Sequence, residues 1–278
     1  MTALVTSSPH GYFTDRSMIR RVMRERAVAL SGPRALLMQA AHPLAVSGLL
    51  AHSDALDDPY VRLARTAEVM SAISFGPRSE ADRLTRRVRA MHTRVRGRLP
   101  RDVGVFPAGT PYRADDPELL MWILYTLVDS AIVVYTTYVG ALRSPERAAL
   151  WEDYKLVGTL FGLRAGEMPD SAAGLREYGE TMLDSGRLHV GDWARRRAKE
   201  IVLAPPVPGR RRPLLETVNF ITIALLPDQI RAQYGFLPVP PAVLRKAMVR
   251  AGAIPVRRGL MPLLPAQLRE VPAARAAA

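Results

Sequence analysis

LLMWILYTLVDSAIVVYTTYVGAL, residues 119–142, is a long apolar stretch that decides the fold class of this chain. It is long enough to cross a bilayer, but Asp129 stands at its middle. A carboxylate at mid-membrane costs roughly 2.5 to 3.5 kcal/mol on insertion scales, and the flanks lack a basic and aromatic anchor pattern. Its aliphatic hydroxyl groups belong to Thr126, Ser130, Thr136 and Thr137. The stretch therefore predicts a buried core helix.

The segments on either side of this stretch are also helical in pattern. Their apolar residues recur every 3.6 positions instead of alternating, and Asp116-Pro117 and Asp58-Pro59 each place a capping carboxylate before a proline suited to a first helical turn. The expected helices cover residues 16–30, 33–52, 58–75, 79–99, 115–141, 145–163, 171–184, 188–202, 213–227 and 240–252. The sequence predicts one all-α domain over residues 1–264 and a flexible Ala/Arg/Pro-rich tail over 265–278.

The chain has 278 residues and no cysteine. This composition excludes disulfides, Cys-ligated zinc, iron–sulfur clusters, thiolate-ligated haem and covalent c-type haem. A transition metal bound here must therefore be held by His, carboxylate, Tyr or Met. The N-terminus lacks a basic region followed by a long apolar run, so we expect a cytoplasmic protein.

The formal net charge of +13 comes almost wholly from arginine, in short clusters spread along the chain. The sequence shows no helix-turn-helix spacing, no zinc-finger ligands and no paired aromatics of an RNA-binding sheet. We therefore expect a solvated basic surface and no nucleic-acid partner, while peripheral contact with anionic lipid stays open. The oligomeric state is not determined by the sequence.

His92 is one of five histidines and the one placed most clearly on an apolar helical stripe. It lies four residues after Val88 and three before Val95, which sets the three side chains on one face. An imidazole in that position either forms a hydrogen bond inside the core or binds a metal. The spacing alone leaves both interpretations open.

Arg62, Arg65 and Thr66 share one face of the next candidate helix, at i, i+3 and i+4. Two guanidinium groups and a hydroxyl can hold an anion such as a carboxylate or phosphate. The same face can equally form a ladder of salt bridges with nearby carboxylates. These are Asp57, Asp58 and Glu68.

His42 lies in a run of small residues, Gln39-Ala-Ala-His-Pro-Leu-Ala-Val-Ser-Gly48, which Pro43 interrupts. The proline leaves an upstream carbonyl without its helical partner. His42 can donate to a bound ligand or satisfy the freed backbone, and the spacing does not decide between these roles.

Taken together, these motifs resemble the family of the latex-clearing rubber oxygenases and the farnesyl-cleaving oxygenase of mycophenolic acid biosynthesis. The resemblance covers roughly residues 15–240. Besides the run at His42, the matching segments are His52-Ser53, Asp58-Pro-Tyr-Val-Arg-Leu-Ala-Arg-Thr66, Ile73-Ser-Phe-Gly76, Met91-His-Thr-Arg-Val-Arg-Gly97, Tyr112-Arg-Ala-Asp-Asp-Pro-Glu-Leu-Leu-Met-Trp122, Thr126-Leu-Val-Asp-Ser130, Tyr138-Val-Gly140, Glu146-Arg147, Leu226-Pro227, Arg231 and Tyr234-Gly235.

The resemblance implies a globin-reminiscent helical fold around a non-covalent haem b, used for O2-dependent cleavage of isoprenoid double bonds. It places His92 as the proximal iron ligand and Arg62, Arg65 and Thr66 on the distal side. In the resulting hypothesis this polar face, with His42 nearby in sequence, orients and polarises the oxygen. Haem propionates need cationic partners, and we expect Arg89 and Arg96, which flank His92, to supply them.

Two departures from the family pattern separate the functional hypotheses. No acidic residue occurs between Gln39 and Ser53, where the rubber enzymes carry a distal Glu, and Leu124 replaces a His of many relatives. The leading hypothesis is a haem b oxygenase acting on a hydrophobic small molecule and O2. The alternatives are a haem-binding sensor or carrier without turnover, a basic lipid or nucleic-acid binder, and a non-haem metal centre. The last would use His42, His52 and His92.

Overall fold

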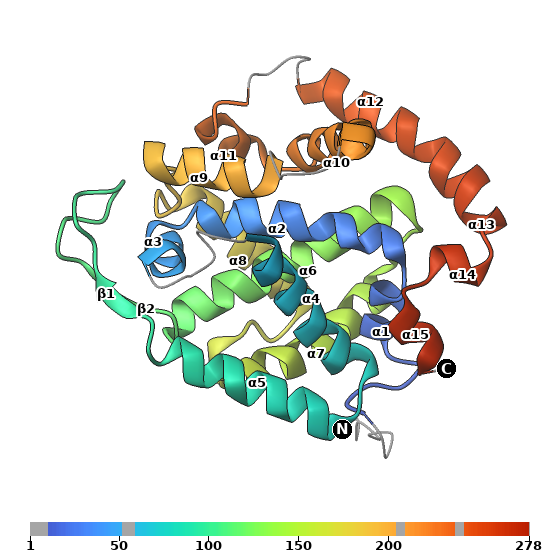
Figure 1. Ribbon diagram of the computed structural model, residues 1–278, viewed down its shortest axis with the longest axis horizontal. Coiled ribbons are helices and arrows are strands. Elements are labelled where there is room, and N and C mark those ends of the chain that lie inside the picture. Colours follow the sequence, from blue (N-terminus) through green and yellow to red (C-terminus); the bar gives the residue numbers. More distant parts are fainter. Residues whose placement is uncertain (1–10, 52–58, 204–208, 237–241, 278) are drawn as a thin grey trace.

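The computed structural model describes residues 11–51, 59–203, 209–236 and 242–277. The side chains of 49–51, of 59–63 and of several residues in four later helices are outside that description. Within it the chain is mainly helical (Figure 1), with one short antiparallel hairpin of strands β1 Arg96–Arg98 and β2 Pro111–Arg113. The prediction of an all-α protein is confirmed.

The helices follow the predicted order, with shorter bounds at several ends. They are α1 Met18–Met23, η1 Arg26–Leu30, α2 Ser31–Ala40, α3 Pro43–Ala51, α4 Pro59–Phe75, α5 Arg78–His92, α6 Pro117–Tyr138, α7 Ser144–Phe161, η3 Ala165–Glu167, α8 Ala172–Asp184, α9 Asp192–Leu203, η4 Gly209–Arg211, α10 Arg212–Ala224, α11 Asp228–Gln233, α12 Ala242–Pro255, η5 Val256–Leu260, α13 Met261–Leu263, α14 Ala266–Arg269 and α15 Pro272–Ala276.

Helix α6 lies at the centre of the molecule, between α2 and α7 (Figure 1). It begins as predicted, because the Asp116 carboxylate accepts a hydrogen bond from the backbone N–H of Glu118 at 2.9 Å and Pro117 occupies the first turn. Trp122 and Val128 on this helix are completely buried. The core of the domain is therefore built around the apolar stretch with which the sequence analysis began.

In the part of the chain that the structure describes, α6 is the one helix long and apolar enough to cross a membrane. Most of it is buried in the fold, and the Asp129 carboxylate lies 2.8 Å from Nη2 of Arg34 on α2. The charge that argued against a membrane span is thus paired inside the protein. This arrangement agrees with the predicted core helix.

The chain breaks between α2 and α3 at the predicted proline. Helix α2 ends at Ala40 and Pro43 opens α3, so that Ala41 and His42 form the corner between them. The Ala41 carbonyl accepts a hydrogen bond from the backbone N–H of His189 at 2.8 Å. A distant loop therefore pairs one carbonyl at this corner, and the imidazole of His42 is not needed for that bond.

Helix α5 is shorter than the predicted helix over 79–99, because it ends at His92 and β1 follows. A Cβ atom at Gly97 would lie 2.5 Å from the hydroxyl oxygen of Tyr112 on β2, so that this pairing requires glycine. Leu99 is buried at the hairpin and does not continue the helical stripe. Pairing with residues 111–113 overrides the local helical pattern, which the periodicity could not reveal.

The C-terminal segment differs from the flexible tail predicted over 265–278. Residues 266–276 form α14 and α15, which dock on the N-terminal helices. The backbone N–H of Val271 donates to the carbonyl of Arg24 at 2.8 Å, and Arg269 lies 3.0 Å from the buried Glu25. The Ala/Arg/Pro-rich composition of the tail could not predict these contacts, because the partners lie about 245 residues away in the sequence.

Candidate functional site

Helix α4 carries the three predicted distal residues. Farther along this helix Val69 and Ile73 are buried, and Arg65 lies on the same face at i−4 and i−8 from them. Arg65 and Thr66 are nevertheless exposed. The inward face of α4 is thus covered in its second half and uncovered at the two polar residues. Arg62 lies on α4, but its side chain is outside the description.

The apolar face of α5 also becomes less buried along the length of the helix. Ala81 and Leu84 are buried, Val88 and His92 are half-buried, and Met91 is 51% exposed. These positions follow each other at helical spacing, so they form one stripe. His92 lies at the C-terminal end of this stripe, where the protein covers it less. The predicted placement of His92 on an apolar face agrees with the structure, although the helix stops there.

The two helices form a hairpin joined at Gly76 and Pro77. Figure 1 shows α4 and α5 diverging from this joint, with the end of α5 running into β1. In each helix the buried face becomes exposed away from this joint. The exposed part carries Arg65 and Thr66 on α4 and is followed by His92 at the end of α5. The fold therefore sets the predicted proximal and distal residues on two adjacent, packed helices.

Helix α3 and the β1–β2 hairpin close this region on another side. A Cβ atom at Gly48 would lie 3.3 Å from Cγ1 of Val95 and 3.7 Å from the ring of Tyr112. Tyr112 is buried, and burial raises the pKa of its hydroxyl. Glycine at position 48 thus allows α3 to approach the residues that directly follow His92.

Arg89 and Arg96, expected to pair with propionates, are both exposed near His92. Nε of Arg89 lies 3.6 Å from the position that a Cβ of Gly162 would take, so the side chain extends toward the end of α7. Arg96 donates to the carbonyl of Thr93, which ends the α5 turn. Arg89 thus extends away from its own helix, whereas Arg96 is folded back on the α5 terminus.

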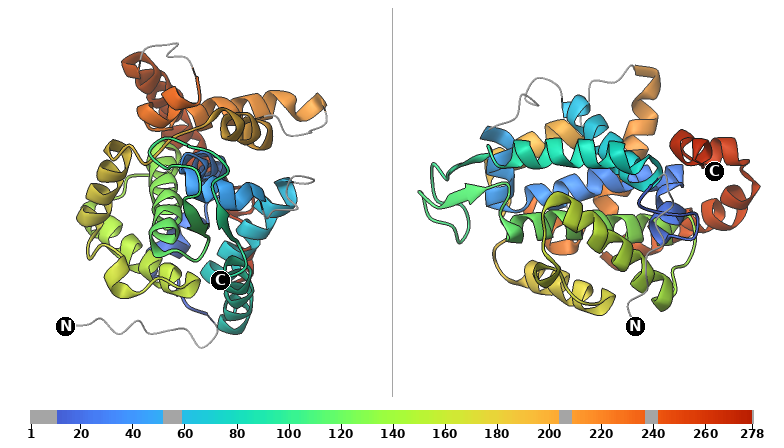
Figure 2. Two further views of the ribbon diagram at one scale, coloured as in Figure 1. Left: turned by 90° about the vertical axis from the view of Figure 1, so that its left-hand side faces the viewer. Right: turned by 90° about the horizontal axis from the view of Figure 1, so that it is seen from below.

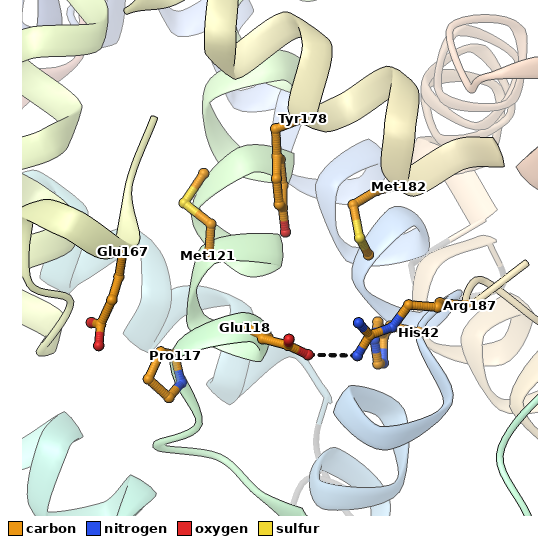
Figure 3. A pocket seen from close by; sticks show the side chains of 8 residues that line it. All are labelled: His42, Pro117, Glu118, Met121, Glu167, Tyr178, Met182 and Arg187. Atoms are coloured by element: carbon orange, nitrogen blue, oxygen red, sulfur yellow. Dashed lines mark hydrogen bonds and ion pairs between the residues drawn. The ribbon is translucent and has the colours of Figure 1, made fainter. Parts of the chain in front are cut away.

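His42 lies in a separate pocket of about 240 Å³, at the corner before α3 (Figure 3). This volume is below the range of about 300–1,000 Å³ typical of ligand pockets. The pocket is lined by residues of α6, η3, α8 and the loop after α8. They are Pro117, Glu118, Met121, Glu167, Tyr178, Met182 and Arg187. None of them belongs to α4 or α5, so the pocket does not bring His42 together with Arg65, Thr66 or His92.

The imidazole of His42 is held neutral. The residue is 1% exposed, and burial, with the nearby Arg187 cation, lowers its pKa to about 4. Its ring lies 5.6 Å from that of Phe106, and Nδ1 has no hydrogen-bond partner among the described residues. At neutral pH this side chain can therefore donate or accept one hydrogen bond without carrying charge.

Sequence reasoning missed the ion pair at this pocket. Nη2 of Arg187 lies 2.6 Å from Oε2 of Glu118, and the guanidinium stacks 5.8 Å from the Phe106 ring centre. The Asp-Pro-Glu motif marked Glu118 as part of a helix start. Nothing in the sequence pointed to its partner 69 residues away.

The described residues offer single histidines and no ready cluster of metal ligands. No group of three or more His, Asp or Glu able to hold a metal ion occurs among these residues. Haem iron is commonly held by a single proximal His, which His92 can supply from the end of its stripe. The proposed centre of His42, His52 and His92 is not assembled in this part of the chain, and His52 lies outside it.

The structure thus shows a helical domain with an arginine and a hydroxyl exposed on α4 and a half-buried histidine at the end of the adjacent, packed α5. The family described as "ER-bound oxygenase mpaB/B'/Rubber oxygenase, catalytic domain" matches residues 20–258. The chain belongs to this family and is an oxygenase domain, acting with O2 on a small molecule. No curated protein and no solved structure matches it.

Proposed function

We propose that this protein is a haem b-dependent oxygenase that oxidises a hydrophobic small molecule, with cleavage of a carbon–carbon double bond as the reaction class. Membership in the oxygenase family supports the reaction type. The observation that carries the haem is the stripe of α5, which is buried at Ala81 and Leu84 and opens at His92.

The residues present fit a haem. The chain has no cysteine to compete as ligand, and His92 lies where the inward face of α5 becomes uncovered. The inward face of α4 becomes uncovered at Arg65 and Thr66. A flat apolar macrocycle would cover both faces and place the His92 imidazole on its iron. When bound, haem supplies a site at which O2 can be activated.

Arg65 and Thr66 act on the oxygen side in this proposal. A guanidinium and a hydroxyl on one helix face donate hydrogen bonds and stabilise negative charge that develops on an oxygen atom. Arg65 cannot serve as the proton donor, because guanidinium does not deprotonate in proteins. A proton transferred to that oxygen atom must therefore be relayed by the Thr66 hydroxyl or by a bound water. Arg62 shares this helix face by its spacing.

His42 takes a positioning role. Its neutral imidazole lies in the corner from which α3 starts, and α3 contacts Val95 and Tyr112 next to His92. We assign the contact with a propionate to Arg89, which is exposed on α5, ahead of Arg96. The Arg96 guanidinium already caps the end of that helix.

The test is an absorption spectrum of protein expressed with haem supply. The wild type is expected to show a Soret band, and His92→Ala is expected to lose at least about ten-fold in haem content. His189→Ala is the matched control, because His189 is exposed and lies outside α4 and α5. Steady O2 consumption with isoprenoid or other apolar substrates then tests turnover.

A wild-type protein without a Soret band contradicts the proposal. A His92→Ala variant with unchanged haem content and spectrum contradicts the assignment of the ligand. If His189→Ala loses haem to the same extent, the effect is not specific to α5.

A second candidate is a haem-binding sensor or carrier. Leu124, at the position of a His in many relatives, is buried, and its Cδ2 lies 2.9 Å from the position of a Cβ on Gly158 of α7. It therefore fills the core between two helices. No carboxylate is available between Gln39 and Ser53 as a base. A Soret band without substrate-dependent O2 consumption favours this candidate.

A further inference from the structure

The C-terminal helices carry an unusual number of exposed apolar side chains. Helices α12, η5, α13 and α14 follow one another along the outer rim of the molecule (Figure 1). The exposed side chains, with their exposed fractions, are Met248 48%, Ile254 51%, Leu260 52%, Leu263 81% and Leu268 61%. We call these five residues the rim patch. Leucines exposed to this degree on consecutive elements are more than the scattered apolar residues of an ordinary surface.

The segment bearing the rim patch is also free of acidic residues. No Asp or Glu occurs from residue 229 to residue 269. Between 242 and 263 the chain carries five cations, namely Arg245, Lys246, Arg250, Arg257 and Arg258. The Arg258 side chain is exposed. An apolar, basic helical surface without acid is the composition of helices that lie in the interface of a membrane.

The rim is anchored to the protein by its other face. Val249, Ala253 and Met261 are buried, and α12 packs against α10 and α6. Nη1 of Arg257 donates to the carbonyl of Thr136 on α6 at 3.2 Å. The rim patch is therefore exposed on a segment whose buried side chains and Arg257 hydrogen bond hold it against the protein.

We propose that the rim patch docks the protein on a membrane surface that contains anionic lipid. The leucines and Ile254 insert among the acyl chains near the head groups, and Arg258, with the net positive charge of the segment, attracts lipid phosphates and carboxylates. A second copy of the chain fits less well, because a symmetric contact would bring two acid-free basic segments together. A nucleic acid would use the cations but leaves the apolar residues without a partner.

The geometry keeps docking apart from the candidate oxygenase site. Figure 2 shows the β1–β2 hairpin, which follows α5, at the end of the molecule opposite to the C-terminal helices. Docking through the rim therefore leaves the region of His92 facing away from the lipid. The proposal is independent of the proposed haem chemistry, and either can fail without the other.

The experiment is co-sedimentation of the full chain with vesicles of phosphatidylcholine, with and without phosphatidylserine, at low and high salt. We expect binding only to the anionic vesicles, weakened by salt as surface charges are screened. The variant Leu260→Glu/Leu263→Glu is expected to weaken binding by at least about ten-fold, through lost insertion and added repulsion. Both side chains are more than half exposed, so the fold should be retained.

Val105→Glu is the matched control. Val105 is 60% exposed on the β1–β2 connection, and its replacement puts one carboxylate in place of an exposed apolar side chain at the opposite end. It is expected to bind vesicles as the wild type does. Circular dichroism and thermal unfolding of all variants check that the fold is intact.

Three outcomes would overturn the proposal. They are equal binding to neutral and anionic vesicles, equal loss in the rim and Val105 variants, and a wild type that stays in solution with every vesicle. Tighter binding to duplex DNA or RNA than to anionic vesicles, unchanged in the rim variant, would instead assign the basic segment to nucleic acid. Concentration-dependent dimerisation lost in the rim variant, without vesicle binding, would assign it to a second copy.

Discussion

The contact of α2 with α6 and the open side of the α4–α5 hairpin both carry an arginine on the face of a core helix. At α2, Arg34 is almost fully buried, and its guanidinium reaches Asp129 at 2.8 Å, the Ser130 hydroxyl at 2.7 Å and the Leu225 carbonyl at 2.8 Å. At α4, Arg65 continues a buried face but is exposed. The guanidinium of Arg34 is satisfied by partners inside the fold, whereas Arg65 is exposed.

This difference separates structural from functional charge. A buried guanidinium is tolerated only when partners satisfy it, and Arg34 has three of them. An exposed guanidinium adds little to stability, so replacing it should change stability far less than breaking the Arg34 pair. The following predictions test that separation in order of the expected change in stability.

The largest effect is expected from Asp129→Ala. This change leaves the buried Arg34 without its counter-charge, and the loss of one partner of a buried pair costs about 3 to 5 kcal/mol. Because the Asp129 side chain is 27% exposed, we expect the lower end of that range. Urea unfolding followed by circular dichroism measures the difference.

The control for Asp129→Ala is Glu118→Ala. Glu118 and Arg187 are also an ion pair, but their side chains are 68% and 35% exposed. A surface pair of this kind contributes about 0 to 1 kcal/mol. If the two variants lose the same stability, the Arg34 pair is not the structural element that we infer.

The second effect is a pH dependence from His42. Its pKa in the folded protein is lowered to about 4 from 6.5, so the unfolded chain binds more protons between these values. Stability is therefore retained above pH 6.5 and falls as the pH drops toward 4. The His42 contribution to this fall between pH 7 and pH 5 is about 2 kcal/mol.

Unfolding of His42→Gln at both pH values isolates this contribution. The variant is expected to lose about 2 kcal/mol less than the wild type over the same interval, because it has no imidazole to titrate. Equal losses in the two proteins would show that the His42 ring is already charged or accessible in the native state.

The smallest change in stability is expected from Arg65→Gln and Thr66→Val. Both residues are exposed, and surface substitutions of this kind stay within about 0.5 kcal/mol. Substrate-dependent O2 consumption is expected to fall by about 100-fold, the loss typical of a removed oxyanion donor. Arg83→Gln on α5 is the control, since Arg83 is exposed and lies off the stripe of His92.

Unchanged O2 consumption in the Arg65 and Thr66 variants would remove the distal role of this face. A loss of stability of several kcal/mol would instead place Arg65 in the same structural class as Arg34. Either result would contradict the distinction between Arg34 as a structural arginine and Arg65 as a functional one.

Much of this arrangement follows from local patterns. The core helix α6 with its Asp116 cap, the break at Pro43 and the place of His92 on the apolar stripe of its helix were all predicted. Each depends on residues within a few turns of one another, where spacing and backbone chemistry suffice.

The parts that were missed depend on distant partners. Helix α5 ends at His92 because β1 pairs with residues 111–113, and the C-terminal helices are held by contacts of Val271 and Arg269 with the N-terminal segment. The pocket of His42 needs Arg187 from beyond α8. Periodicity carries no information on pairs so far apart in the chain.

The sequence by itself determined that this is an all-α chain without thiol ligands, with His92 on an apolar stripe and two polar groups on one helix face. Those properties depend on residue type and on 3.6-residue spacing. Only the tertiary structure decided which arginine is satisfied inside the fold, where the inward faces become uncovered, and which apolar residues stay outside. Burial and ion pairing depend on the neighbours that folding brings together, and these come from every part of the chain.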